Sequence, residues 1–335
     1  MHGIDINHQE PVFLGLESGG TKLVVSLGTG DGSIFACRNI PRPPTHRAGD
    51  TLRDLISIGR EMIAEAPGPV EAVGYGFGGI VNRETGKPVL NLHEEGWPDI
   101  DAKTMLEEAF GLSVFCENDC KVAALAEAHL GHGSPEGISI YITVGSGIGG
   151  GIVHNGRVLA TSIWGEAEIG HVVVEPDGPL CGCGNRGCLE AICSGWGIAD
   201  RALQKAEDSP HAHGTFASRL RLLPRAAVAH EVFTAYPDEP LAVACVQDFC
   251  TMLGRACSFL CNVLTPQVIV FGGGVMQNHW LLPKIEAAAR THTAPYLRQP
   301  TRFAPAALGE RVVSAGAILF ARQQFTQATA KTLAL

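Results

Sequence analysis

One short segment, residues 171–190, constrains the fold more than any other because it combines a histidine, three cysteines and several glycines. It reads HVVVEPDGPLCGCGNRGCLE, with His171, Cys181, Cys183 and Cys188 as possible ligands. One imidazole and three thiolates form a common tetrahedral zinc shell and fill all four positions. A closed shell leaves no place for a catalytic water. The segment therefore predicts a structural zinc site around which the neighbouring chain must wrap.

The other cysteines are predicted to be buried thiols. The chain has 11 cysteines in 335 residues. In a large chain this usage favours metal binding and free thiols over a disulfide framework. The cysteines outside the metal segment have apolar neighbours and are assigned to the core: Cys37, Cys116, Cys120, Cys193, Cys245, Cys250, Cys257 and Cys261.

Composition and charge narrow the class of protein. Apolar residues make up 45% of the chain, charged residues 18%, and there are 41 glycines, as in a loop-rich α/β enzyme of two domains. The net charge is −9 and no basic cluster offsets it, so no nucleic-acid partner is expected. No long apolar run and no basic-then-apolar start is found. We therefore expect neither a membrane span nor a signal peptide, and a cytoplasmic location.

Three glycine-rich loops follow predicted strands. Residues 13–28 and 138–155 both run from a strand through a glycine reversal into a second strand, and residues 266–276 form a strand that ends in glycines. Glycine lets backbone N–H groups approach a phosphate closely. Turn formation alone would not explain why all three loops lie at strand ends. The pattern predicts phosphate binding.

The string GSGIGG at residues 145–150 also fits a dinucleotide-binding pattern. That fold needs a helix to begin at the glycines, so that the helix N-terminus meets the pyrophosphate. Here the chain continues as GIVHNGRVL, which is β-branched and closes with an Asn-Gly turn. An oxidoreductase is therefore disfavoured. No G-x-x-x-x-G-K-[ST] string occurs, which excludes a P-loop NTPase.

Taken together, these motifs resemble the ROK family of repressors, open reading frames and kinases, within the actin-like ATPase superfamily of sugar kinases. The most specific string is E-x-x-H followed by C-x-C-x₄-C-x-E, because the spacing from the histidine to the first cysteine is that of the family. The resemblance extends from about residue 12 to residue 322 and rests on GLESGGTK (15–22), GYGFGGIVN (74–82), ENDCKVAALAE (117–127), TVGSGIGGG (143–151), EIGH (168–171), CGCGNRGCLE (181–190) and VFGGGV (270–275).

The resemblance implies an α/β, two-lobed actin-like ATPase (ribonuclease H-like) fold with an interlobe cleft. Residues 12–120 with 308–335 would form the N-terminal lobe, and residues 121–307 the C-terminal lobe. The implied activity is ATP-dependent phosphorylation of a hexose, of the glucokinase type, to its 6-phosphate. Lobe closure would exclude water, which otherwise competes for the phosphoryl group. A homodimer or higher homo-oligomer is expected.

The family pattern also implies the sugar site. Asp119 matches the catalytic base, which takes the proton of the attacking hydroxyl, and it is placed where a strand ends and a helix begins. The alternative for Asp119 is a helix N-cap. Trp97 is expected either near the sugar or packed beneath a lid. The implied sugar contacts are Gly79, Asn118, Asp119, Glu168, His171 and Glu190, and Asn91 is also expected to contact the sugar. Carboxylates, amides and an imidazole suit vicinal hydroxyls, which both donate and accept hydrogen bonds.

The nucleotide side follows from the glycine loops. Glu17 is expected to face a Mg²⁺-bound water or a phosphate, and Mg²⁺ would arrive with ATP. The adenosine is expected near Gly273 and Gly274. The complete set of predicted nucleotide contacts is Glu17, Gly19, Gly20, Thr21, Lys22, Gly145, Ser146, Gly147, Gly273 and Gly274.

His171 belongs to both the sugar set and the metal set. The resemblance implies that one ring nitrogen binds zinc and the other binds a sugar hydroxyl. Zinc would then fix the orientation of the imidazole. The metal would hold the wall of the sugar site, which also carries Glu168 and Glu190, and would perform no chemistry.

Several positions depart from the family pattern. Glu17 replaces the usual aspartate of the first loop and reaches one methylene further. Asn82 ends a string that has lost the usual proline and aspartate. Glu166 and Ala167 occupy positions where small residues are usual. These changes bear on which sugar is bound.

Four other functions compete with glucose phosphorylation. Three of them are also kinase activities: fructokinase, N-acetylmannosamine or N-acetylglucosamine kinase, and a polyphosphate-using glucokinase. The fourth is a sugar-responsive repressor of the same family. A repressor needs a DNA-binding helix-turn-helix ahead of the first phosphate loop, whereas few residues precede Gly15 and the chain is acidic. The repressor is therefore disfavoured.

Overall fold

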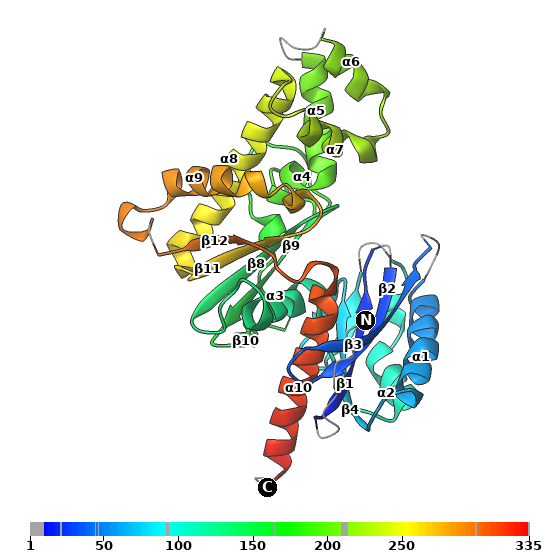
Figure 1. Cartoon of the computed structure of the whole chain (residues 1–335). Coiled ribbons are helices and arrows are strands. Elements are labelled where there is room, and N and C mark those ends of the chain that lie inside the picture. The colour runs from blue at the N-terminus through cyan, green and yellow to red at the C-terminus, as the bar shows by residue number, and fades with distance from the viewer. Residues whose placement is uncertain are drawn as a thin grey trace. The chain divides into compact units, whose positions relative to one another are not determined.

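The computed structural model describes residues 10–20, 22–43, 45, 47–91, 94–163, 165–208, 214–298 and 300–333. The chain divides into two compact units (Figure 1). Unit 1 comprises Met1–Gly131, Gly151–Glu166 and Ala307–Leu335, and unit 2 comprises His132–Gly150 and Ala167–Ala306. Thr21, one of the predicted nucleotide contacts, lies outside the described residues.

Unit 1 is built on a mixed five-stranded sheet of order β3-β2-β1-β4-β7. Strands β1 and β2 pair antiparallel, and β1, β4 and β7 run parallel to one another. Central strand β1 is buried along its whole length, as its nearly unbroken apolar sequence predicts. The strands are β1 (Val12–Ser18), β2 (Lys22–Thr29), β3 (Ile34–Pro41), β4 (Val70–Phe77) and β7 (Val114–Asn118).

Helices and a small hairpin complete unit 1. Helix α10 packs closely on both the sheet and α3: a Cβ on Gly74 would lie 1.9 Å from the carbonyl oxygen of Ala317, and one on Gly316 1.9 Å from that of Val122. The remaining elements are α1 (Ala48–Ala64), β5 (Ile80–Asn82), β6 (Lys87–Leu90), the 3₁₀ turn η1 (Trp97–Asp99), α2 (Ala102–Phe110), α3 (Asp119–Leu130), η6 (Gly309–Arg311) and α10 (Val312–Leu333).

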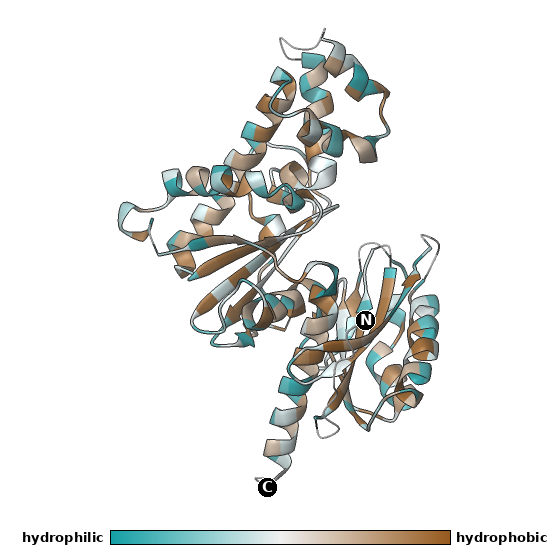
Figure 2. Cartoon of the chain, in the orientation of Figure 1, coloured by the Kyte–Doolittle hydropathy of each residue, from teal (hydrophilic) through white to brown (hydrophobic). Residues whose placement is uncertain are grey.

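The second sheet has the order β10-β9-β8-β11-β12. Strands β8, β11 and β12 are parallel, so β8 and β11 end at the same edge. Hydrophobic residues concentrate on the strands of both sheets (Figure 2). The strands are β8 (Ile138–Val144), β9 (Ile148–His154), β10 (Arg157–Val158), β11 (Val268–Gly272) and β12 (Arg302–Pro305).

Along the chain, all the described helices of unit 2 except η2 follow the last cysteine of the metal segment and precede β12. The full set comprises the 3₁₀ turns η2 (Ile169–His171), η3 (Val275–Gln277), η4 (His279–Leu281) and η5 (Pro295–Leu297), and α4 (Leu189–Cys193), α5 (Gly195–Asp208), α6 (Thr215–Leu222), α7 (Arg225–Ala235), α8 (Pro240–Leu264) and α9 (Leu282–His292). Among the described residues, no helix is both long and apolar enough to cross a membrane.

Two expectations about local structure can be compared with the fold. Strand β9 begins at Ile148, within the GSGIGG string at residues 145–150, so the dinucleotide-binding helix is absent at that point of the described chain. Cys37 was expected in the core, and this is wrong. Its side chain is exposed because it lies on β3, at the edge of the sheet, where exposure alternates along the strand. Cys120 is half-buried, and the other cysteines assigned to the core are buried.

The unit boundaries differ from the lobe boundaries expected from the sequence. Helix α3 and residues 151–166 group with unit 1, whereas the boundary after residue 120 would place them in the C-terminal lobe. The reason is packing, because α3 makes extensive contact with α10. The lobes themselves, 12–120 with 308–335 and 121–307, stay a prediction.

Candidate active site and metal centre

The segment Glu117–Asn118–Asp119 forms the junction between β7 and α3. Asn118 caps the helix: its Oδ1 accepts hydrogen bonds from the N–H groups of Cys120 at 3.0 Å and Lys121 at 3.2 Å. The alternative in which Asp119 is the N-cap is therefore wrong. Asp119 occupies the first helical position, where its Oδ1 accepts from Cys120 N–H at 2.7 Å.

Four of the predicted sugar contacts meet at this junction. Asn118 Nδ2 donates to the carbonyl oxygen of Gly79 at 3.1 Å. Gly79 in turn lies against the end of β6, since a Cβ there would be 2.1 Å from the carbonyl oxygen of Leu90 and 3.1 Å from Asn91 Cα. Only glycine fits such an approach. Unit 1 thus gathers Gly79, Asn91, Asn118 and Asp119.

Glu17 lies at the end of β1, beside the first glycine turn. Its side chain is buried and its Oε2 accepts a hydrogen bond from Ser314 Oγ at 3.1 Å. Burial raises the pKa of Glu17 to about 7, although Lys22 and the Ser314 hydrogen bond act in the opposite direction. The turn itself is closed by a hydrogen bond from Gly19 N–H to the carbonyl of Lys22 at 3.0 Å.

The raised pKa of Glu17 makes stability depend on pH in the absence of ligands. The folded protein keeps its proton up to about pH 7, whereas the unfolded chain loses it near 4.5. The free energy of unfolding therefore falls as pH rises through this window. Glu17→Gln removes this titration. The free energy of unfolding of the variant, relative to that of wild type, should therefore rise by about 2 kcal/mol from roughly pH 5 to roughly pH 6.5.

Urea unfolding at the two pH values measures this difference. The matched control is Glu310→Gln, because Glu310 is exposed and pairs with Lys22 at 3.1 Å. Its stability relative to wild type should not change across the window. An unchanged difference between wild type and Glu17→Gln would show that Glu17 titrates as an ordinary carboxyl.

Two glycine loops meet at one edge of the second sheet. The loop after β8 is closed by Gly145 N–H donating to the carbonyl of Gly147 at 2.9 Å. The loop after β11 packs on the same strand end, since Gly273 has φ +88° and a Cβ there would lie 2.4 Å from the carbonyl oxygen of Val144. A Cβ on Gly274 would meet no described atom within 4 Å. Unit 2 therefore brings Gly145, Ser146, Gly147, Gly273 and Gly274 together.

Glu190 supports the first of these loops. It lies on α4, and its Oε2 accepts a hydrogen bond from Ile148 N–H at 2.9 Å. The same oxygen would lie 2.7 Å from a Cβ at Gly147. Glu190 was expected only as a sugar contact. It thus also links the metal segment to the glycine loop.

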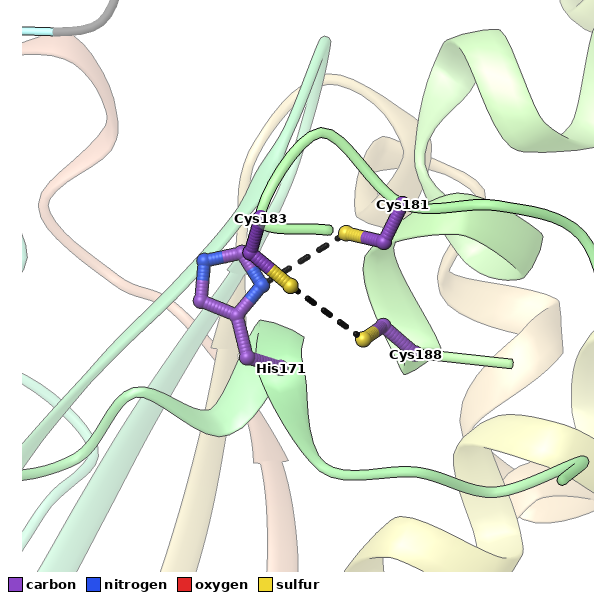
Figure 3. Close-up of side chains that lie close together, drawn as sticks. All are labelled: His171, Cys181, Cys183 and Cys188. Atoms are coloured by element: carbon purple, nitrogen blue, oxygen red, sulfur yellow. Dashed lines mark hydrogen bonds between the residues drawn. The ribbon is translucent and has the colours of Figure 1, made fainter. Parts of the chain in front are cut away.

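The four metal-ligand candidates converge on one point in unit 2 (Figure 3). Their ligand atoms all lie within 4.8 Å of one another; His171 Nδ1 is 3.7 Å from Cys181 Sγ, and Cys183 Sγ is 3.7 Å from Cys188 Sγ. Tetrahedral zinc with Zn–S bonds of about 2.3 Å separates its sulfurs by about 3.8 Å. The donor set and its spacing fit zinc.

Glycines allow the chain to wrap around this cluster. Gly184 has φ +94° in the turn that follows Cys183, and Gly187 has φ +73°. A Cβ on Gly187 would lie 1.6 Å from the carbonyl oxygen of Glu175. His171 turns Nδ1 toward the sulfurs, which leaves Nε2 on the opposite side of the ring. The carboxylate of Glu168, just before the η2 turn, is exposed.

Ala167 adopts a left-handed backbone with φ +68°. Small residues are usual at this position in the family pattern. A left-handed conformation costs a non-glycine residue about 1–2 kcal/mol, partly offset by the greater freedom of glycine in the unfolded chain. Ala167→Gly is therefore expected to stabilise the protein by about 0.5–1 kcal/mol.

Thermal unfolding checks this expectation. The control is Ala294→Gly, because Ala294 is half-buried like Ala167 but has φ −51°. That variant should lose stability, since glycine then brings only extra freedom to the unfolded chain. A lower melting temperature for Ala167→Gly would contradict the strain argument.

A cluster of three charged residues, Arg83, Glu117 and Glu166, was not predicted from the sequence. Arg83 pairs with Glu117 at 2.7 Å and lies 3.8 Å from Glu166. Burial raises the pKa of Glu117, while the charge of Arg83 lowers it. Glu117 Oε1 accepts from Asn118 N–H at 2.9 Å, so the cluster braces the strand end that carries Asp119. Glu166 was noticed in the sequence because small residues are usual at its position. Its partner Arg83 is far away in sequence, and no local pattern connects the two.

Comparisons with known proteins agree with the motifs. The family model described as the ROK family matches residues 13–324. A glucokinase of Thermotoga maritima is 33% identical over 266 residues, 78% of this chain and 82% of that protein. An N-acetylmannosamine kinase of Citrobacter koseri is 35% identical over 193 residues, 56% of this chain and 63% of that protein.

A solved structure resembles the fold over nearly the whole chain. The ROK family glucokinase from Streptomyces griseus, crystallised with glucose and AMPPNP, aligns with a TM-score of 0.75 and 27% sequence identity. The alignment covers 93% of this chain and 99% of the other.

Proposed function

This chain belongs to the ROK family, and we propose that it is an ATP-dependent hexose kinase of the glucokinase type. The observation that carries the proposal is the junction of β7 and α3, where Asp119 is gathered with Gly79, Asn91 and Asn118. A carboxylate beside backbone and amide groups suits a sugar hydroxyl. The similar glucokinase structure with glucose and AMPPNP supports both substrates.

In the proposed reaction Asp119 is the general base. Its carboxylate accepts the proton of the sugar 6-hydroxyl as the hydroxyl oxygen attacks the γ-phosphorus of ATP. The bond from that phosphorus to the bridging oxygen breaks, and ADP leaves. Phosphoryl transfer depends on alignment more than on covalent chemistry, so a base at the rigid first position of α3 suits the role.

The rest of the sugar site is proposed to come from the metal segment. Glu168, His171 and Glu190 would contact the remaining hydroxyls, with His171 using Nε2. Zinc would hold His171 and the three cysteines, and so fix the loop on which these side chains stand. The convergence of the four ligand atoms within 4.8 Å of one another supports this arrangement.

The nucleotide is proposed to bind the three glycine loops. Gly19, Gly20, Thr21 and Lys22 would contact phosphates from unit 1, and the loops at residues 145–147 and 273–274 from unit 2. Magnesium bound with ATP would neutralise charge that builds on the phosphates. Glu17 is the carboxylate beside the first loop, and its ionisation would follow the arrival of that cation.

A second candidate function is N-acetylmannosamine phosphorylation. The N-acetylmannosamine kinase shares slightly higher sequence identity with this chain than the glucokinase does, but over a shorter part of both chains. The longer match to the glucokinase favours an unsubstituted hexose.

An assay of ADP release against a sugar panel tests the proposal. The panel holds glucose, mannose, fructose, N-acetylmannosamine and N-acetylglucosamine, with ATP or polyphosphate as the donor. We expect ATP and glucose to give the highest kcat/KM. A higher kcat/KM for an N-acetylated sugar would select the second function, and no sugar-dependent ADP release would contradict a kinase.

A further inference from the structure

A buried ion pair lies inside unit 1, away from the groups assigned to catalysis. Arg42 follows β3, and Glu94 precedes the η1 turn; their side chains are only 5% and 0% exposed. Arg42 Nη1 is 3.4 Å from Glu94 Oε2. The same carboxylate accepts from Thr51 Oγ1 at 2.5 Å and from Trp97 Nε1 at 2.9 Å. Both oxygens of the Glu94 carboxylate therefore accept hydrogen bonds, whereas Nε of Arg42 is buried without a partner among the described residues. A buried carboxylate held in this way fixes the groups around it.

One end of this network reaches the first glycine turn. Arg42 Nη2 donates a hydrogen bond to the carbonyl oxygen of Gly20 at 2.8 Å. Gly20 is itself one of the proposed phosphate contacts. The hydrogen bond to its carbonyl oxygen restrains the backbone of this residue, so Arg42 positions a proposed phosphate-binding residue.

The other end reaches the sugar side. Glu94 and Asn91 pair in an isolated β-bridge. The Trp97 ring is fully buried and packs edge-on against Phe77, with 4.5 Å between ring centroids. Phe77 in turn lies 2.7 Å from the position that a Cβ would take on Gly79. Trp97 is thus a packing residue, and Glu94 is linked to Asn91 by the β-bridge.

We infer that Arg42 is a positioning residue that couples hexose binding to phosphate binding, through the ion pair with Glu94. The inference rests on the proposed function. A hexose held by Gly79 and Asn91 orders the segment that carries Glu94. Glu94 then holds the guanidinium of Arg42, which restrains the backbone of Gly20. The nucleotide consequently binds more tightly when the sugar is present.

The geometry requires a guanidinium in particular. Two of its nitrogens face different partners, the Glu94 carboxylate and the Gly20 carbonyl. A lysine ammonium keeps the charge but concentrates its donors at one point, so it cannot hold both partners in the same way. Arg42→Lys therefore separates the link between the two loops from the mere presence of a positive charge.

Calorimetric titration of AMPPNP, with and without saturating glucose, tests the inference. In wild type we expect glucose to tighten AMPPNP binding by at least about fivefold, the lower end of common coupling. In Arg42→Lys the ratio should fall below about twofold. The matched control is Arg38→Lys, which stands on β3 but pairs with the exposed Glu61 and Glu65, and should keep the wild-type ratio.

Glu94→Gln provides a second variant if Arg42→Lys does not fold. It keeps a side chain of the same shape, whose Oε1 can accept from Trp97 Nε1 while its amide donates to Thr51 Oγ1, but it loses the charge that holds Arg42. The ratio should fall in this variant as well. Because the ratio compares two affinities of one protein, a general loss of stability does not lower it.

The outcomes separate the two proposals. Wild type that binds neither ligand contradicts the proposed function, and the inference with it. Wild type that binds both without coupling contradicts the inference alone. A folded Arg42→Lys or Glu94→Gln variant that keeps the wild-type ratio of AMPPNP affinities with and without glucose also contradicts the inference alone.

Discussion

Replacing Asp119 by asparagine is expected to lower kcat by about 10²- to 10⁴-fold, the range for loss of a general base. Asparagine has nearly the same shape and can still accept the hydrogen bond from Cys120 N–H that Asp119 makes. Hexose affinity should therefore remain within about threefold of wild type. Steady-state kinetics and a glucose titration measure the two effects separately.

Asp101→Asn is the matched control. Asp101 is also an aspartate at a helix start, where its side chain accepts from Thr104 N–H at 3.2 Å and caps α2. Asparagine caps a helix equally well, so kcat should not change. If Asp119→Asn kept kcat within about threefold of wild type, Asp119 would not be the base.

The sequence predicted the parts of the site that depend on short spacing. The metal ligands within the segment 171–190 converge because glycines 184 and 187 supply the left-handed turns that the loop needs. The glycine loops at 145–147 and 273–274 meet because β8 and β11 are parallel neighbours. Strand ends and turn residues are visible in a sequence, and these two features set the geometry here.

What could not be predicted depends on pairs far apart in the chain. Arg42 and Glu94 face each other across unit 1, as do Arg83 and Glu117, and no local pattern marks either pair. The capping residue of α3 was also ambiguous, since Asn118 and Asp119 are both good caps. Only the exact end of β7 decides between them.

Cys183→Ser is expected to remove the zinc and weaken hexose binding by about 10- to 100-fold, the scale on which disrupted metal shells lose function. Cys183 belongs to the four-ligand cluster, and the same loop carries Glu168, His171 and Glu190. Zinc-peptide binding energies, on the order of 10 kcal/mol, overstate the loss of global stability because most of the core folds without the metal.

Three measurements follow the consequences of this change. Elemental analysis should find one zinc per wild-type chain and none in the variant. Hydrogen exchange should rise around residues 165–192, while the sheet of unit 1 stays protected. AMPPNP affinity, measured without sugar, should change less than hexose affinity, because the metal segment carries proposed sugar contacts itself but is tied to a proposed nucleotide loop through the hydrogen bond from Ile148 N–H to Glu190. The control is Cys37→Ser, because Cys37 is exposed on β3 and outside the metal cluster, and this variant should keep both zinc and hexose affinity.

The same experiment separates a structural metal from a catalytic one. Four protein ligands fill the tetrahedral shell, so a zinc held by all of them has no open position for a substrate oxygen. A structural zinc acts through the position of His171 and its neighbours, and its loss raises the Kd for hexose. A Lewis acid acts on the reacting oxygen, and its loss would abolish turnover while hexose still bound. Chelator-treated wild type that binds glucose with unchanged affinity but no longer turns over would overturn the structural role.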